Sequence, residues 1–115
     1  MLPLALRLGR DQATQVLKLG RPWSGAYLSA RILRSSDHLL PSRFAFVVSS
    51  KNVKRAVDRH QLKRRGRSII INQREHLAPG YWAMIFFKAS ARELNFASLE
   101  KDMLNLLTAT KLLIK

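Results

Sequence analysis

The segment Tyr81–Phe87 (YWAMIFF) contains apolar residues only, and it limits the folds open to this chain more than any other segment. It is far shorter than the roughly 20 residues that a membrane-spanning helix needs. Its length and its aromatic residues predict a β-strand. Because neither side of this strand is polar, both of its faces must be covered, and we expect it at the centre of a sheet.

A second strand is expected over Arg43–Ser49, where apolar residues again occupy both sides. Phe44, Phe46 and Val48 alternate with Ala45 and Val47. Asn52 is a suitable N-cap for a helix from Val53 to about Asn72. Pro79–Gly80 predicts a turn before the central strand. The middle of the chain is therefore predicted to be strand, helix, strand.

The flanking segments add two helices and a strand. Gly9–Asp11 can begin a helix that ends at Leu19, with Val16 and Leu17 as its buried contacts. Residues 23–33 are expected to form a strand, followed by a loop over residues 35–41. Asn95 is expected to cap a last helix. Its apolar side chains recur at helical spacing and are interpreted as core: Leu99, Met103, Leu106, Leu107, Thr110 and Ile114.

Length and composition indicate one domain, residues 1–115, of the mixed α/β class. A chain of 115 residues rarely holds two independent cores, and 47% hydrophobic residues is a globular composition. No internal repeat and no Gly/Ser linker divides it. The chain has no cysteine, which excludes disulfides, thiolate zinc sites and cysteine nucleophiles.

The net charge of +14 comes from 21 Lys and Arg against 7 Asp and Glu. Such an excess repels itself in a compact chain unless a polyanion is the usual partner. The excess is concentrated in the middle, since residues 51–75 carry nine basic and two acidic side chains. A nucleic acid is the first expectation. No basic residue precedes the short apolar N-terminus, so we expect no secretory signal and a cytoplasmic protein.

Basic side chains recur every four residues through this segment: Lys51, Arg55, Arg59, Lys63 and Arg67, with His60 and Arg64 beside them. Residues four apart share one face of a helix, where like charges repel by a few tenths of a kcal/mol per pair. A phosphate backbone turns this repulsion into attraction and releases counterions. The other interpretation is an ordinary solvated face, but only Asp58 is interspersed. Gly66 either lets the backbone approach a neighbour or bends the helix.

The segment Arg43–Arg64 (RFAFVVSSKNVKRAVDRHQLKR) resembles the signature of the bacterial ribonuclease P protein component. In that family a strand ending in lysines leads through an Ala-Val pair into Arg-Asn-Arg-x-Lys-Arg on a helix. Leu94–Glu100 and Val16–Gly20 resemble the start of the family's last helix and the end of its first. Several family positions carry other residues here: Ala13, Leu17, Ala45, Ser50, His60 and Gln61.

The resemblance implies an α+β two-layer sandwich like the second domain of ribosomal protein S5. It would contain a mixed sheet of about four strands, three helices and a left-handed strand–helix–strand crossover. It also implies a function: a protein subunit of ribonuclease P, which removes the 5′ leader of precursor tRNA. A catalytic RNA and its Mg²⁺ ions would carry out the hydrolysis. The protein would bind that RNA in a 1:1 complex, help to hold the leader, and itself bind no cofactor, membrane or DNA.

Carried over by position, the resemblance and the basic row give these RNA-binding residues: Lys51, Arg55, Arg59, His60, Lys63, Arg64 and Arg67. Tyr27, Phe44 and Phe46 are candidates for stacking on leader bases, although a core role for Phe44 and Phe46 is the stronger interpretation. With Ala13 and Leu17 where the family has Phe, such stacking would be weaker.

No catalytic residue is expected in this chain. The histidines, His38, His60 and His76, are scattered, and no catalytic motif or metal-ligand spacing accompanies them. Asp37 beside His38 is interpreted as turn chemistry. A ribosomal or other structural RNA-binding protein remains an alternative. DNA binding lacks the second helix of a helix-turn-helix, and membrane-surface binding lacks a clear apolar face.

Overall fold

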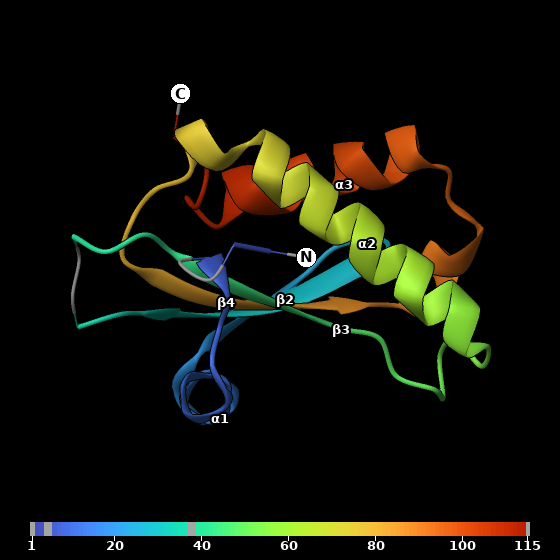
Figure 1. Ribbon diagram of the computed structural model, residues 1–115, viewed down its shortest axis with the longest axis horizontal. Helices are drawn as coiled ribbons and strands as arrows, with labels where there is room; N and C mark the ends of the chain where they lie inside the picture. Colours follow the sequence, from blue (N-terminus) through green and yellow to red (C-terminus); the bar gives the residue numbers. More distant parts are fainter. Residues whose placement is uncertain (1, 4–5, 37–38, 115) are drawn as a thin grey trace.

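The computed structural model describes residues 2–3, 6–36 and 39–114, which form a four-stranded sheet and three α-helices (Figure 1). The elements are α1 (Arg10–Leu19), β1 (Arg21–Ser24), β2 (Leu28–Arg34), β3 (Arg43–Val47), α2 (Ala56–Asn72), η2 (Arg74–His76), β4 (Tyr81–Phe87), η3 (Ala89–Glu93) and α3 (Phe96–Ala109). The mixed α/β class predicted from the sequence is confirmed. Asp37 and His38, assigned to a loop above, lie outside the described residues.

The sheet has the strand order β1-β2-β4-β3, which places β4 in its interior. β4 pairs antiparallel with β2 and parallel with β3. The two parallel neighbours are connected through α2, as the strand–helix–strand pattern predicts. The central position predicted for Tyr81–Phe87 is confirmed, and it follows from the need to cover both faces of an apolar strand.

Helices cover the sheet on both sides (Figure 1). α2 and α3 lie side by side on one face, over a core that includes Phe44, Phe46 and Val48. α1 lies on the opposite face, where Val16 packs with Met84 against Ala45 and Val47. The alternation predicted for the second strand is therefore confirmed.

The last helix begins and packs as predicted. The Asn95 side chain caps α3, its Oδ1 accepting a hydrogen bond from the backbone N–H of Ser98 at 2.8 Å. The core positions of its stripe are fully buried: Leu99, Met103, Leu106 and Leu107. The stripe ends there, because Thr110 is the C-cap and the chain then turns at Lys111, where φ is 64°. Ile114 is outside the helix and 51% exposed, so its assignment to the stripe was wrong.

The predicted start of the basic helix was also wrong. α2 begins at Ala56, and its N-cap is Arg55 rather than Asn52. Asn52 and Val53 belong instead to a turn in which both backbone N–H groups bond to the Ser49 carbonyl. This turn places Val53 in the core with no exposed surface. Burial of one apolar side chain before the helix thus outweighs the local capping signal.

Two further expectations near the N-terminus are corrected. Residues 23–33 form no single strand, since the Gly25 N–H bonds to the Leu28 carbonyl at 2.8 Å and closes a turn between β1 and β2. In α1 only Val16 is buried, whereas Leu17 is 49% exposed. The contact between this helix and the sheet is narrow, so Leu17 stays beside the core rather than in it.

Gly66 allows α2 to lie close to the sheet. It is buried, and a Cβ atom at this position would stand 2.8 and 2.9 Å from two carbons of the Phe46 ring. The same atom would stand 3.2 Å from Phe87, whose ring packs against Phe46 with centroids 6.2 Å apart. The sequence allowed either a bend or a close backbone approach at this glycine, and close approach is the one observed.

We therefore expect Gly66→Ala to destabilise the protein by about 1–2 kcal/mol. Overpacking costs about 1–3 kcal/mol, and the better helix propensity of Ala offsets up to about 1 kcal/mol of it. Urea unfolding followed by circular dichroism measures the change. His60→Ala, at an exposed position of the same helix, is the control. Equal stability of the Gly66→Ala variant and the wild type would contradict the close-packing account.

Candidate nucleic-acid interface

α2 has a buried face and a basic flank. Its buried residues, Leu62, Gly66, Ile69 and Ile70, define the side that packs on the sheet. At 100° per residue, the predicted residues His60, Lys63, Arg64 and Arg67 all project to one side of that buried face. We call these four residues the basic flank. His60 and Arg64 are exposed, while Lys63 and Arg67 are partly buried.

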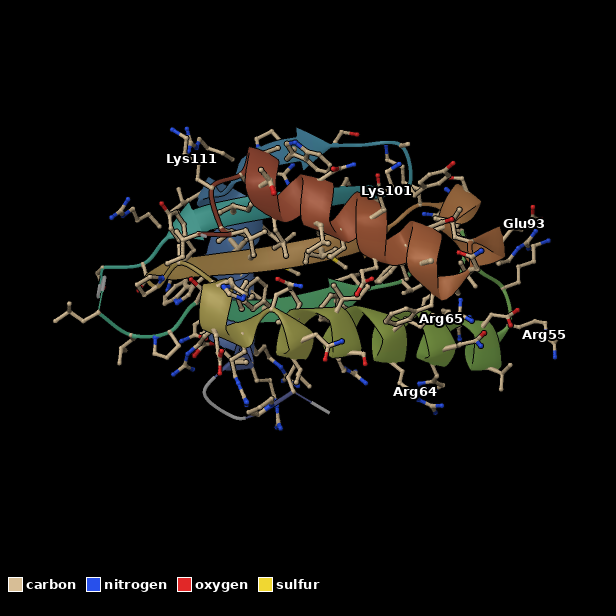
Figure 2. The ribbon with its side chains drawn as sticks, turned by 90° about the horizontal axis from the view of Figure 1, so that it is seen from above. Arg55, Arg64, Arg65, Glu93, Lys101 and Lys111 are labelled. Atoms are coloured by element: carbon tan, nitrogen blue, oxygen red, sulfur yellow. The ribbon has the colours of Figure 1, made fainter. Side chains whose placement is uncertain are left out.

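The basic flank faces away from α3. Figure 2 shows Arg64 projecting from the outer side of α2, and Arg65 directed toward α3. Arg65, which the sequence did not single out, donates a hydrogen bond from Nη1 to the Leu94 carbonyl at 3.0 Å. Its charge therefore serves a contact within the protein. One side of α2 thus uses a basic side chain for a contact within the protein, whereas the other side carries the residues predicted to bind RNA.

Lys51 and Arg55 do not lie on the helix face to which the four-residue spacing assigned them. Lys51 is in the turn that precedes α2, and Arg55 is the N-cap residue. Both side chains are exposed. They extend the positive charge beyond the helix N-terminus (Figure 2 labels Arg55) rather than forming one straight row with Lys63 and Arg67.

Arg59 is bound to the turn before its own helix. Its Nη1 donates hydrogen bonds to the carbonyls of Val53 at 3.0 Å and Lys54 at 2.8 Å. Both carbonyls belong to the chain that precedes the first turn of α2. Arg59 therefore holds the chain between β3 and α2 in place, so a positioning role stands beside its predicted contact with RNA.

The aromatic candidates for leader binding are placed differently from one another. Phe44 is 1% exposed and Phe46 is 9% exposed, both in the core between the sheet and the helices. Their burial confirms the core role, which was the stronger interpretation, and makes stacking on leader bases wrong for Phe44 and Phe46. Tyr27 is half-buried in the turn before β2, and its carbonyl accepts a hydrogen bond from the Lys88 N–H at 2.9 Å.

A cleft of about 400 Å³ lies along β1, β2 and β4, and Arg31 and Phe86 are among its lining side chains. Arg31 reaches α1, where its Nη1 contacts the Leu17 carbonyl at 3.5 Å. Neither residue was predicted from the sequence. The alternation of Leu28, Ala30 and Ile32 with polar Ser29 and Arg31 could have indicated an open face here.

Charge compensation is nearly absent from the described part of the chain. Its one ion pair joins Arg92 and Glu93, with the nearest N and O atoms 3.6 Å apart, away from the basic flank.

Within residues 2–3, 6–36 and 39–114, no three His, Cys, Asp or Glu side chains gather as metal ligands. The same residues include no helix long and apolar enough to cross a membrane. His60 and His76 are exposed in different elements, and His38 lies outside the described residues.

Comparison with known proteins gives one consistent result. A family model described as Ribonuclease P matches residues 6–111. A Microcystis aeruginosa protein named "Ribonuclease P protein component" is 31% identical over 115 residues, which cover 97% of this chain and 96% of the relative. A Thermus thermophilus protein with the same name is 37% identical over 102 residues, 89% of this chain and 58% of that longer protein.

Solved structures agree in fold. A mutant Staphylococcus aureus RNase P protein superposes with a TM-score of 0.82 at 19% identity, over 93% of this chain and 89% of that one. The RNase P protein from Thermotoga maritima, solved with a fluorophenyl thiourea, gives a TM-score of 0.76 at 25% identity, over 89% of this chain and 95% of that one. The four-stranded sheet with three helices predicted from the resemblance is confirmed.

The Arg59 geometry predicts that Arg59→Ala loosens the chain before α2. Two carbonyls lose a charged donor, and because the guanidinium is partly exposed the expected loss of stability is about 1 kcal/mol. Hydrogen exchange at residues 49–55 should also become faster. Arg64→Ala, which removes an exposed charge from the same helix, should change stability by less than about 0.5 kcal/mol. The same unfolding midpoint for both variants would contradict this role.

Proposed function

This chain belongs to the ribonuclease P protein family, and we propose that it binds the catalytic RNA of that enzyme through the basic flank of α2. As a member of the family it is a protein subunit of ribonuclease P, with a role in the maturation of tRNA 5′ ends. Its partner is an RNA. The identity of that RNA, the binding of precursor tRNA and the assignment of residues are our proposals.

The observation that carries the proposal is the placement of uncompensated charge on a rigid helix. The basic flank is fixed by packing of α2 through Leu62, Gly66 and Ile69. No described carboxylate forms an ion pair with it. Side chains held at helical spacing without counter-charges fit the regular phosphates of a folded RNA, and each contact releases condensed counterions. His60 adds a hydrogen-bond donor where the family motif has Asn.

We further propose that the 5′ leader of precursor tRNA lies along the cleft that Arg31 and Phe86 line. A guanidinium and a partly exposed aromatic ring in one cleft suit a single strand, which offers both phosphates and bases for stacking. Trp23 and Ser24 border the same cleft. Arg31 and Phe86 replace Phe44 and Phe46 as leader candidates, since the latter two are buried.

In this proposal the protein contributes binding and the RNA contributes chemistry. Mg²⁺ held by the RNA would activate water for hydrolysis of the phosphodiester bond. The chain's own residues neutralise repulsion between two polyanions and orient the leader. The complex would contain one protein and one catalytic RNA, and would act in the cytoplasm.

A cleavage assay tests the proposed function. Precursor tRNA is incubated at low Mg²⁺ with a bacterial-type catalytic RNA, with and without the protein. We expect the protein to stimulate 5′ maturation, and the double variant Lys63→Ala/Arg64→Ala to lose about tenfold or more in RNA affinity because two phosphate contacts are removed. Lys101→Ala/Lys111→Ala, which removes the same charge from exposed positions on the α3 side, is the matched control (Figure 2).

Two results would count against the proposal. Equal loss in both double variants would mean that net charge, and not the basic flank, governs binding. Absence of stimulation while RNA binding persists would bring forward another RNA partner, such as ribosomal RNA.

Salt dependence gives an independent prediction. If about six phosphates are contacted, affinity for the RNA should fall on the order of a thousandfold between 50 and 200 mM salt. Filter binding at a series of KCl concentrations measures the slope. Affinity that hardly changes over this range would be incompatible with recognition of a phosphate backbone.

A further inference from the structure

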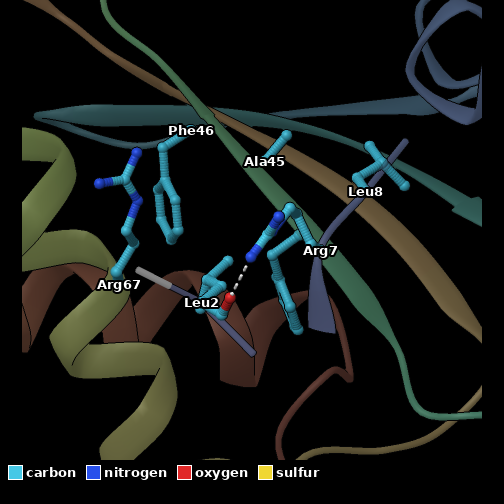
Figure 3. A pocket seen from close by; sticks show the side chains of 7 residues that line it. Leu2, Arg7, Leu8, Ala45, Phe46 and Arg67 are labelled. Carbon is cyan, nitrogen blue, oxygen red and sulfur yellow. Dashed lines mark hydrogen bonds between the residues drawn. The ribbon is translucent and has the colours of Figure 1, made fainter. Parts of the chain in front are cut away.

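A small cleft brings together two arginines from distant parts of the sequence. Arg7 precedes α1 and Arg67 lies on α2, and both line a cleft of about 260 Å³ beside β3 (Figure 3). The Phe46 ring lies between the two guanidinium groups in Figure 3, and Leu2 forms part of the wall. Arg67 belongs to the basic flank, whereas nothing in the sequence pattern singles out Arg7.

Both side chains start from fixed positions. The segment that carries Arg7 is attached to the edge of the sheet, because the Leu8 N–H donates to the Phe44 carbonyl at 3.0 Å. The Arg7 Nη2 also donates to the Leu2 carbonyl at 3.0 Å. Arg67 follows Gly66, which packs directly against the Phe46 ring. The Arg7 side chain is therefore partly ordered before binding, which lowers its entropy cost on binding, and the backbone of Arg67 is held by the packing of Gly66.

The cleft has positive charge that nothing on the described part of the protein neutralises. Its described lining consists of two arginines, four large apolar side chains and one alanine. Neither arginine forms an ion pair with a described carboxylate. Two guanidinium groups that line one cleft repel each other, and an anion bound in that cleft lowers the repulsion. A guanidinium has five N–H donors. One of those of Arg7 is hydrogen-bonded to the Leu2 carbonyl, so others remain for a ligand.

The edge of β3 supplies a neutral donor as well. β3 is an outer strand of the sheet. The backbone carbonyl of Phe44 points away from β4, to the outer edge of the sheet, and accepts the hydrogen bond of the Leu8 N–H there. Phe46, two residues on, directs its N–H to the same edge because successive residues alternate. After Leu8 the N-terminal segment turns away into α1, and within the described chain no other strand lies beside Phe46 on this edge.

Size limits the ligand. The cleft is smaller than the roughly 300–1,000 Å³ of sites that enclose a small molecule. It therefore suits one charged group at the end or along the length of a larger molecule. Arginine forks match the tetrahedral oxygens of a phosphate in bidentate fashion. The cleft is continuous, through Arg67, with the flank to which we assign the RNA backbone.

We propose that Arg7 and Arg67 together bind a single phosphodiester group of the RNA partner at the edge of β3. This inference rests on the proposed function and extends it: one phosphate is held by residues from two elements, while each remaining contact of the basic flank uses one element. The N-terminal segment is thereby part of the RNA interface.

A double-mutant cycle tests this geometry. Arg7→Gln, Arg67→Gln and the double variant are compared with the wild type for affinity to a bacterial-type catalytic RNA at several salt concentrations. Gln removes the charge and keeps a polar side chain, and thermal unfolding verifies that each variant is folded. Arg10→Gln, an exposed residue three positions on with the same change in charge, is the matched control.

We expect each single variant to lose about tenfold in affinity, and the control no more than about threefold. The loss in the double variant should be well below the product of the single losses, because the two side chains share one ligand. The slope of log affinity against log salt should fall by about one unit in the double variant. Arg7→Lys, which keeps the charge but not the fork, should bind more weakly than the wild type.

The inference is overturned if Arg7→Gln binds like Arg10→Gln, or if the single losses multiply and the slope falls by about two units. If the wild-type protein still binds the RNA in either case, the proposed function is not contradicted. A wild-type protein that does not bind the catalytic RNA would overturn the proposed function and this inference together.

Discussion

The close packing of Gly66 against Phe46 and Phe87 sets the position of the basic helix α2, and with it the direction of the basic flank. It joins α2 to the centre of the sheet at a point where a side chain would not fit. With the helix held there, its rotation is fixed, and the basic flank is directed away from α3. The same contact places Arg67 beside Phe46. The packing of Gly66 in the core therefore also determines where the side chains of the basic flank point.

The second constraint is electrostatic. A net charge of +14 on 115 residues, with one ion pair among the described residues, means that the folded chain works against its own repulsion. Some basic side chains are bound inside the protein, as Arg59 is to Val53 and Arg65 is to Leu94. These contacts need no anion. For the side chains of the basic flank no hydrogen bond to a backbone carbonyl of the described chain is observed, and no described carboxylate pairs with them, so their donors are the ones we propose for RNA.

Much of the fold could be predicted, and the errors have definable causes. The strand Tyr81–Phe87 was predicted with its exact bounds, and the strand predicted over Arg43–Ser49 is observed as Arg43–Val47. Both were recognised because an apolar run, and an alternation covered on both sides, are typical of strands inside a covered sheet. The start of α2 was placed too early, since a local Asn cap signal cannot report that Val53 is more stable in the core. Lys51 was assigned to a helix face because it continues the four-residue spacing of basic residues, but it lies in the turn before α2. Residue type alone could not show whether Phe44 and Phe46 belong to the core or stack on the bases of the leader.

Local sequence patterns were enough to establish most of the elements, the class and the kind of partner. Periodicity, caps and charge are properties of short segments that can be recognised without coordinates, and the motif around Arg59 and Lys63 resembled one family. The folded chain was needed to show which arginines are bound within the protein and which side chains meet. Arg7 and Arg67 are sixty positions apart, and only the pairing of the N-terminal segment with the edge of β3 brings them into one cleft. Contacts between distant segments depend on packing geometry, which no local pattern encodes.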